Sequence, residues 1–326
     1  MKTLLLAAVK VVLTIGLFAL ALRSIDLGDV LLHIRRLPLI LLVLTVGLLC
    51  CQMAIAATRL SAITGIIASP VPLGQSVRIN LIGAFFSQAL VTFVSGDVVR
   101  AMLLKRTCAI PMRESVGTIT LDRVVGLLST LLLVSITAPW AIQLTGDESM
   151  RHSIELLAIV GAMLIVAFAV VGYVARHPEL VAIVRAKIID LKIIYILLDI
   201  ATVARHLFRA RRAPPTILAT SLVIQIINVI IIFILINGMG ADVSIWQCML
   251  IVPTVMLISL LPFSVAGWGL RESAISTGFA LIHAPVAAAV AASVIFGVAT
   301  LLMALPGGLL WWSSRAITPP RGAETT

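Results

Sequence analysis

Long apolar runs, separated by short charged segments, dominate the chain. Runs of this kind are long enough to cross a hydrocarbon core as helices, which takes roughly 20 residues. They cover residues 4–22, 39–57, 116–139, 154–174, 217–236, 246–261 and 285–312. Because the runs are continuous and lack the two-residue alternation of barrel strands, the pattern predicts membrane-spanning α-helices.

Two shorter apolar stretches, residues 79–94 and 273–283, adjoin Gly-rich or charged breaks. Each is a span, half a span or a re-entrant hairpin. The chain is therefore expected to be an all-α, polytopic transmembrane helical bundle of about eight spans, with re-entrant or broken helices. We expect one transmembrane domain over residues 1–315 and a disordered tail over 316–326. The first run is expected to be retained, because no small-residue cleavage site follows Leu22.

The composition excludes a soluble globule. Hydrophobic residues make up 61% of the chain, charged residues 12%, and the mean hydropathy is +1.17. Too little polar surface remains to cover a water-soluble fold. A bacterial plasma (inner) membrane is the expected location.

The formal charge of +10 is concentrated between the apolar runs. Residues 176–212 hold Arg176, Arg185, Lys187, Lys192, Arg205, Arg209, Arg211 and Arg212. The positive-inside rule predicts that this connection is cytoplasmic, and its apolar part, 188–200, is expected to lie at the interface. Anionic lipid headgroups are the expected partner. Nucleic acid is excluded as a partner, because no aromatic interleaving or groove-reading element accompanies the basic residues.

A second basic segment contains Arg100, Lys105, Arg106 and Arg113 and should also be cytoplasmic, whereas residues 140–152, with Asp147 and Glu148, suit the outside. The side of the N-terminus stays open, since it depends on whether residues 79–94 cross. A crossing by residues 273–283 would place the C-terminus inside.

Scattered cysteines and histidines offer no disulfide framework and no metal-ligand spacing, and the phosphate-binding loop of nucleotide hydrolases is missing. We therefore expect no cofactor, no metal and no ATP hydrolysis. Any transport would run downhill, be coupled to an ion gradient or depend on another subunit.

Charges inside or beside the apolar runs are the candidate chemistry, because each costs about 2.5–3.5 kcal/mol at the centre of a spanning helix. They form three clusters. The candidate headgroup-binding residues are Asp97, Arg100, Asp122, Arg123, Arg271 and Glu272, and the candidate helix breaks are Gly96, Pro262, Gly267 and Gly269.

The first and third clusters share the pattern L-x5-G-x3-R, with Gly96 matching Gly267 and Arg100 matching Arg271. This correspondence suggests an internal repeat, and broken helices at matching positions of two repeats are typical of transporter binding sites. A broken helix exposes backbone N–H groups, and an arginine adds a planar fork of donors. Together they suit a phosphate.

Other interpretations of these residues stay open. Arg100 could snorkel to the interface, and Gly267 and Gly269 could serve close helix packing. Asp122 and Arg123 point about 100° apart on a helix and need separate partners, so Asp97 with Arg123 is one possible pairing. For Arg271 and Glu272 a functional role outweighs a structural one.

Three segments carry a resemblance to a known family. They are Gly96-Asp97-Val98-Val99-Arg100, Leu121-Asp122-Arg123-Val124-Val125-Gly126 and Leu261-Pro262-Phe263-Ser264-Val265-Ala266-Gly267-Trp268-Gly269-Leu270-Arg271-Glu272. In their order and spacing the chain resembles the lysylphosphatidylglycerol synthase transmembrane, or flippase-like, family, as a stand-alone membrane domain without the aminoacyltransferase domain.

The resemblance implies a membrane protein that moves or exports lipids, with the six charged residues at the family's charged motif positions. Two features depart from the family's pattern. Residues 90–95 lack the Pro and extra Gly of its first motif, and Ala266 stands in place of a glycine.

The expected function is translocation of an anionic or polyprenyl/hopanoid-type lipid across the inner membrane, without enzymatic activity. The alternative is a non-transporting membrane partner subunit of a lipid- or glycan-modifying enzyme. A membrane enzyme acting on a lipid-linked sugar is a third class, but no D-x-D-like spacing supports it.

Overall fold

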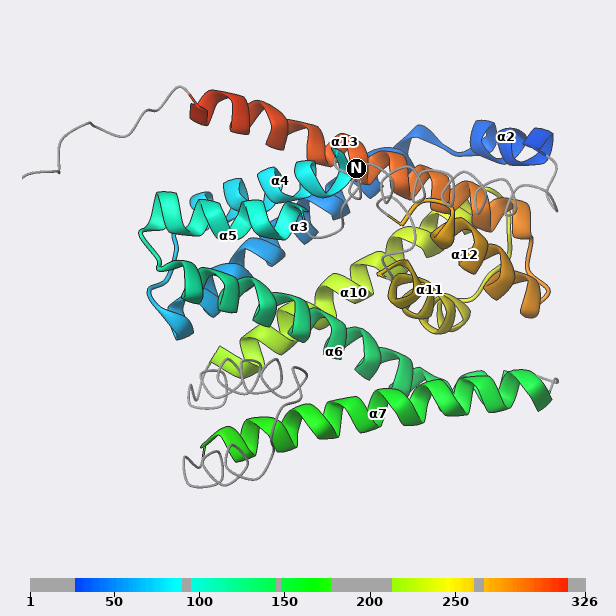
Figure 1. Ribbon diagram of the computed structural model, residues 1–326. Helices are drawn as coiled ribbons and strands as arrows, with labels where there is room; N and C mark the ends of the chain where they lie inside the picture. The colour runs from blue at the N-terminus through cyan, green and yellow to red at the C-terminus, as the bar shows by residue number, and fades with distance from the viewer. Residues whose placement is uncertain (1–26, 90–94, 145–147, 177–212, 261–266, 316–326) are drawn as a thin grey trace, which may run out of the picture.

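The computed structural model describes residues 27–89, 95–144, 148–176, 213–260 and 267–315. In these ranges every regular element is an α-helix, which confirms the all-α membrane bundle (Figure 1). The helices are α2 (Leu27–Arg36), α3 (Leu39–Ile67), α4 (Leu73–Ala89), α5 (Ser95–Cys108), α6 (Met112–Leu144), α7 (Glu148–Arg176), α10 (Ala213–Gly238), α11 (Ile245–Ser259), α12 (Leu270–Leu281) and α13 (Val286–Arg315).

Four of the described helices, α3, α6, α10 and α13, are long and apolar enough to cross a bilayer. Shorter apolar segments lie in α7, at Ala158–Phe168, and in α11. The chain is therefore a multi-pass membrane protein. The predicted first span, nearly all of the basic connection and the C-terminal tail lie outside the described residues, so the count of about eight spans stays a prediction.

Several helices extend beyond the apolar runs that predicted them. Helix α3 continues past Ala57 to Ile67, and α6 runs through Pro139 to Leu144. Since α7 begins at Glu148, most of the segment 140–152, predicted as an outside loop, is helical. Hydropathy marks the part of a helix that faces lipid, whereas the i→i−4 hydrogen bonds continue into polar sequence.

Helices α3–α6 and α10–α13 form two units with the same order: a long helix, two short ones and a long one. In both units the two short helices, of 12 to 17 residues, pack together. At about 18–25 Å these helices are shorter than the roughly 30 Å hydrocarbon core. The internal repeat expected from the L-x5-G-x3-R pattern thus has a structural counterpart.

The short helices form antiparallel hairpins. In the α4–α5 hairpin, Gln75 donates a hydrogen bond to the carbonyl of Thr107 at one end, while Gly96 lies against Ser87 at the other. In the α11–α12 hairpin, Gly278 lies against Ile251 and Gly267 against Ser259. Figure 1 shows the two hairpins in opposite halves of the bundle, with α6 and α13 running past both.

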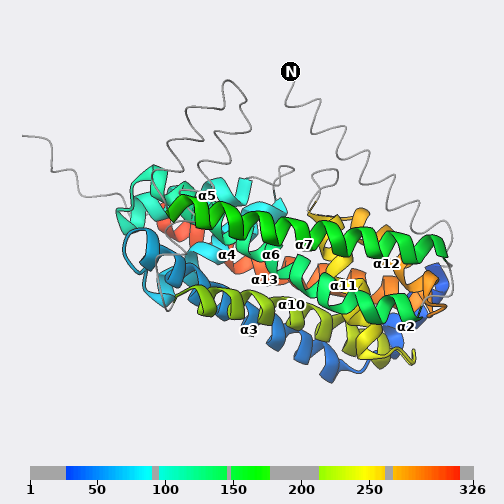
Figure 2. The ribbon, with the colours of Figure 1, turned by 90° about the horizontal axis from the view of Figure 1, so that it is seen from below.

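The two units are inverted relative to each other. Their first helices, α3 and α10, lie side by side (Figure 2) and run antiparallel, because Arg59 contacts Ser221 while Gln52 contacts Asn228. Each hairpin also packs on the last helix of the other unit, α4 on α13 and α11 on α6. Each hairpin is therefore held between its own unit and the other.

Local sequence explains where the hairpins end. Gly267 and Gly269 have φ of 81°, a left-handed conformation that favours glycine and stops helical continuation before α12. After α5 and α12 the chain turns through left-handed residues, Ala109 and His283, each followed two positions later by proline. The carbonyl oxygens of these prolines accept the first backbone hydrogen bonds of α6 and α13, from Ser115 and Ala289.

Gly307 brings α13 into direct contact with α4. A Cβ at Gly307 would meet the backbone carbonyl oxygen of Leu81, which cannot yield unless the helices separate. Gly307→Ala is expected to lower the free energy of unfolding by about 1–3 kcal/mol, the usual cost of overpacking. Thermal unfolding in detergent measures this. Gly47→Ala in α3 is the control: a Cβ there meets nothing within 4 Å, and a destabilisation equal to that of Gly307→Ala would contradict the prediction.

Candidate functional site

Three helices, α3, α5 and α6, bring five charged side chains together inside the bundle. They are Arg59, Asp97, Arg100, Asp122 and Arg123, and we call them the arginine site. Three arginines and two aspartates leave one net positive charge. Four of the five were predicted from the sequence as candidate headgroup residues.

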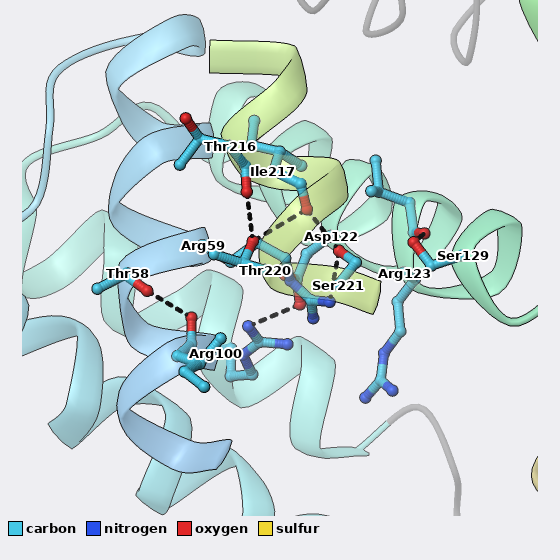
Figure 3. Close-up of polar contacts among 12 residues, drawn as sticks. Thr58, Arg59, Arg100, Asp122, Arg123, Ser129, Thr216, Ile217, Thr220 and Ser221 are labelled. Atoms are coloured by element: carbon cyan, nitrogen blue, oxygen red, sulfur yellow. Dashed lines mark hydrogen bonds and ion pairs between the residues drawn. The ribbon is translucent and has the colours of Figure 1, made fainter. Parts of the chain in front are cut away.

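Asp122 is the centre of the arginine site. Its carboxylate accepts a hydrogen bond from Arg59 Nε at 2.8 Å and one from Arg100 Nη2 at 3.0 Å (Figure 3). The side chain of Asp122 is only 4% exposed, and that of Arg100 only 9%. Arg59 also donates from Nη1 to the hydroxyl of Ser221 on α10 at 3.0 Å. Asp122 thus joins α3, α5 and α6 in a buried, charged contact.

Arg123 points away from Asp122 (Figure 3) and forms a two-pronged ion pair with Asp97, at 2.8 Å from Nε and 2.7 Å from Nη2. Its side chain is 44% exposed, so it is the accessible cation of the group. Arg100 Nη1 lies 3.5 Å from Asp97 and links the two halves of the site. The pairing of Asp97 with Arg123, considered from the sequence, is present.

Small residues on the α4–α5 hairpin position Arg100. A Cβ at Gly83 would overlap the Arg100 stem, and a Cβ at Gly96 would overlap Ser87 and the Gly83 carbonyl. Gly96, predicted as a helix break, lies in the first turn of α5, where it permits this close packing. Arg100 therefore does not snorkel to the interface, and its Nε is a buried donor without a hydrogen-bond partner.

The second charged cluster lies at the start of α12. Arg271 donates to Glu272 Oε1 from Nε and Nη2, at 3.1 and 2.8 Å, and from Nε to the hydroxyl of Ser293 on α13 at 3.0 Å. Glu272 also accepts from Ser293 and from the backbone N–H of Gly269.

Aromatic rings close the second cluster. The guanidinium of Arg271 lies 5.1 Å from the ring centre of Trp268 and 5.5 Å from that of Phe296, within the range of cation–π attraction. The Glu272 side chain is fully buried. Arg271 and Glu272 thus form a sealed pair, in contrast to the arginine site with its half-exposed Arg123.

The two clusters occupy matching positions in the two units. Arg100 contacts Asp122 and Arg271 contacts Ser293, and both pairs are 22 residues apart in the chain. Glycines at the same offset, Gly126 and Gly297, follow Asp122 and Ser293 and lie against Arg59 and Arg271 respectively. The structure therefore divides the six predicted charged residues between the two units.

Sequence reasoning missed Arg59, Ser221 and Ser293. Arg59 had a signal, because it follows a long apolar run directly, but the predicted span ended at Ala57 and treated it as flanking sequence. Pro262, a predicted break, lies outside the described residues. In the described ranges no three His, Cys, Asp or Glu side chains gather closely enough to hold a metal ion.

Comparison with known proteins places these features in a family context. The sequence model described as the lysylphosphatidylglycerol synthase TM region matches residues 7–308, which include both charged clusters and all of the two units except the end of α13. Comparison with curated proteins gives no match.

Proposed function

Because the chain belongs to the lysylphosphatidylglycerol synthase transmembrane-region family, we propose that it carries an anionic lipid across the membrane and binds the lipid headgroup at the arginine site. The observation that carries the proposal is the net positive, largely buried arginine site with one accessible guanidinium, between the spanning helices α3 and α6 and the short helix α5. Charged side chains are costly at membrane depth and are usually functional there.

A phosphodiester suits this site chemically. Its oxygens accept charge-assisted hydrogen bonds, and the planar guanidinium presents donors in a fork that matches them. Arg123 is accessible to such a group, and it would exchange part of its pairing with Asp97 for the phosphodiester. The buried Nε of Arg100, which has no hydrogen-bond partner, would supply a further donor.

The inverted units support transport over a static role. Inverted repeats with interrupted helices are typical of transporters, in which one element moves against the other around a central site. We propose that the α4–α5 and α11–α12 hairpins are re-entrant from opposite sides. In this proposal Arg271 and Glu272 serve the headgroup in the other half of the bilayer, after Ser293 and Glu272 release the guanidinium.

The direction of entry follows from charge. Lys105 and Arg106 occupy the last turn of α5, the helix that carries Asp97 and Arg100. By the positive-inside rule this end of α5 is cytoplasmic. The proposal therefore places the protein in a bacterial inner membrane and brings the anionic headgroup in from the cytoplasmic leaflet.

Reconstitution into liposomes tests the proposal. Fluorescently labelled lipids with anionic and zwitterionic headgroups are incorporated, and dithionite bleaches only the label that reaches the outer leaflet. We expect the protein to accelerate the loss of protected label for anionic lipids over zwitterionic ones. Absence of movement for every lipid would contradict the proposal and favour a partner subunit of a lipid-modifying enzyme.

A further inference from the structure

A chain of uncharged polar side chains continues inward from the arginine site. Gln52 Nε2 donates to Asn228 Oδ1 at 3.2 Å, Asn228 Nδ2 donates to Gln225 Oε1 at 3.3 Å, and Gln225 Nε2 donates to Thr130 Oγ1 at 2.5 Å. These four residues come from α3, α10 and α6, the same three helices that hold Arg59, Ser221 and Asp122. We call them the amide track.

The amide track and the arginine site are parts of one polar seam. Gln52, Thr130 and Asn228 each lie about two helical turns, roughly 10–12 Å, from Arg59, Asp122 and Ser221 on the same helices. Gln225 lies between Ser221 and Asn228, about one turn from each. Gly126, whose carbonyl accepts the Thr130 hydroxyl, lies on α6 between them, against Arg59. Gln52 falls near the middle of α3 (Leu39–Ile67), so the seam reaches the middle of a membrane-spanning helix.

One polar atom of the amide track has no protein partner. Gln52 Oε1 is buried and accepts no hydrogen bond. In a hydrocarbon environment an amide oxygen without a donor costs several kcal/mol. Hydrogen bonds between helices explain why the other amides pair, as they commonly do in membrane bundles, but they do not explain an acceptor left open at the end of the track.

The chemistry of the track selects a class of ligand. Amides and hydroxyls both donate and accept hydrogen bonds, which matches the hydroxyl group of an alcohol or a sugar. A cationic ligand is disfavoured, because the neighbouring arginine site carries a net positive charge. A second anion is disfavoured, because the open atom of the track, Gln52 Oε1, is an acceptor.

We propose that the amide track binds the hydroxyl groups of a lipid headgroup whose phosphate is held by the arginine site. This inference rests on the proposed function and narrows it: the substrate is an anionic phosphodiester lipid with a hydroxyl-bearing headgroup. A hydroxyl proton donates to Gln52 Oε1, while Thr130, Gln225 and Asn228 hold the remaining hydroxyls along the seam.

Two lipids that differ only in headgroup hydroxyls test the inference. Dihexanoyl phosphatidylglycerol and dihexanoyl phosphatidylmethanol have the same charge, the same phosphodiester and the same tails, but only the first carries free hydroxyls. Each is titrated by calorimetry into the protein in phosphatidylcholine nanodiscs. We expect a Kd about tenfold lower for phosphatidylglycerol, the effect of one or two net hydrogen bonds.

Gln52→Met keeps the shape of the side chain and removes the open acceptor. We expect it to bring the two Kd values within about twofold of each other and to leave the Kd of phosphatidylmethanol unchanged. Gln75→Met is the matched control, because Gln75 also bridges two helices through its amide N–H but lies outside the track. Should Gln52→Met fail to fold, Thr130→Val makes the same test at the other end of the track.

The outcomes separate the two proposals. Equal affinities for both lipids in the wild type, or a tenfold preference retained in folded Gln52→Met, would overturn the hydroxyl site and leave the arginine site standing. Binding of neither lipid would overturn the hydroxyl site and the proposed function together.

Discussion

Asp122→Asn is expected to lower the free energy of unfolding by about 3–5 kcal/mol, the largest stability change of any single substitution considered for this protein. The reason is that Asp122 is the carboxylate that joins Arg59 and Arg100, both largely buried. Removing one partner of a buried ion pair leaves the other charge uncompensated, and here two guanidiniums lose their shared anion. The amide NH2 of an asparagine would also replace one of the two acceptor oxygens and face the donors of one guanidinium.

Chemical or thermal unfolding of the purified protein in detergent measures this effect. Asp242→Asn is the control, because it makes the same chemical change at an exposed position. A change below about 1 kcal/mol for Asp122→Asn would mean that water, and not Asp122, compensates the two arginines.

Arg123→Ala is expected to have the largest effect on transport with little effect on stability. The Arg123 side chain is half-exposed, and exposed ion pairs contribute about 1 kcal/mol or less to folding. Losing a charge-assisted contact to a phosphodiester costs about 1.5–3 kcal/mol, which corresponds to a slowing of translocation by roughly 10- to 100-fold. The dithionite assay on reconstituted protein measures the rate.

Arg113→Ala is the matched control for Arg123→Ala, since it removes an exposed arginine from the same helix, α6, outside the arginine site. We expect its translocation rate to stay within about twofold of the wild type. Equal losses in both variants would indicate that general surface charge, and not the arginine site, attracts the lipid.

The predictions from sequence and the structure agree best where a signal is local. The apolar runs identified α3, α6, α10 and α13 as spans, and the pattern L-x5-G-x3-R suggested an internal repeat. The run 246–261 was also predicted as a span, but α11 is a short helix of the second hairpin. The helix ends were less accurate, because hydropathy stops where lipid contact stops. That error left Arg59 outside the predicted span and hence outside the predicted site.

The sequence pattern did not predict that the two charged clusters have different partners and different exposure. Arg100 and Arg271 occupy matching positions, yet one shares Asp122 with Arg59 and the other is enclosed by Glu272, Ser293 and two aromatic rings. Which carboxylate meets which guanidinium depends on the rotation of each helix against its neighbours. Spacing along one chain segment does not contain that information.

The sequence by itself showed that this protein lies in a membrane and is helical. It also suggested the internal repeat and identified most of the charged residues of the two clusters. These properties follow from transfer free energies and backbone hydrogen bonding, which act residue by residue. Only the tertiary structure decided that the units are inverted, that Arg59 completes the arginine site and that Gln52, Thr130, Gln225 and Asn228 form one track. Each of these joins residues far apart in the chain, and side-chain contacts across helices are fixed by packing, which has no local signature.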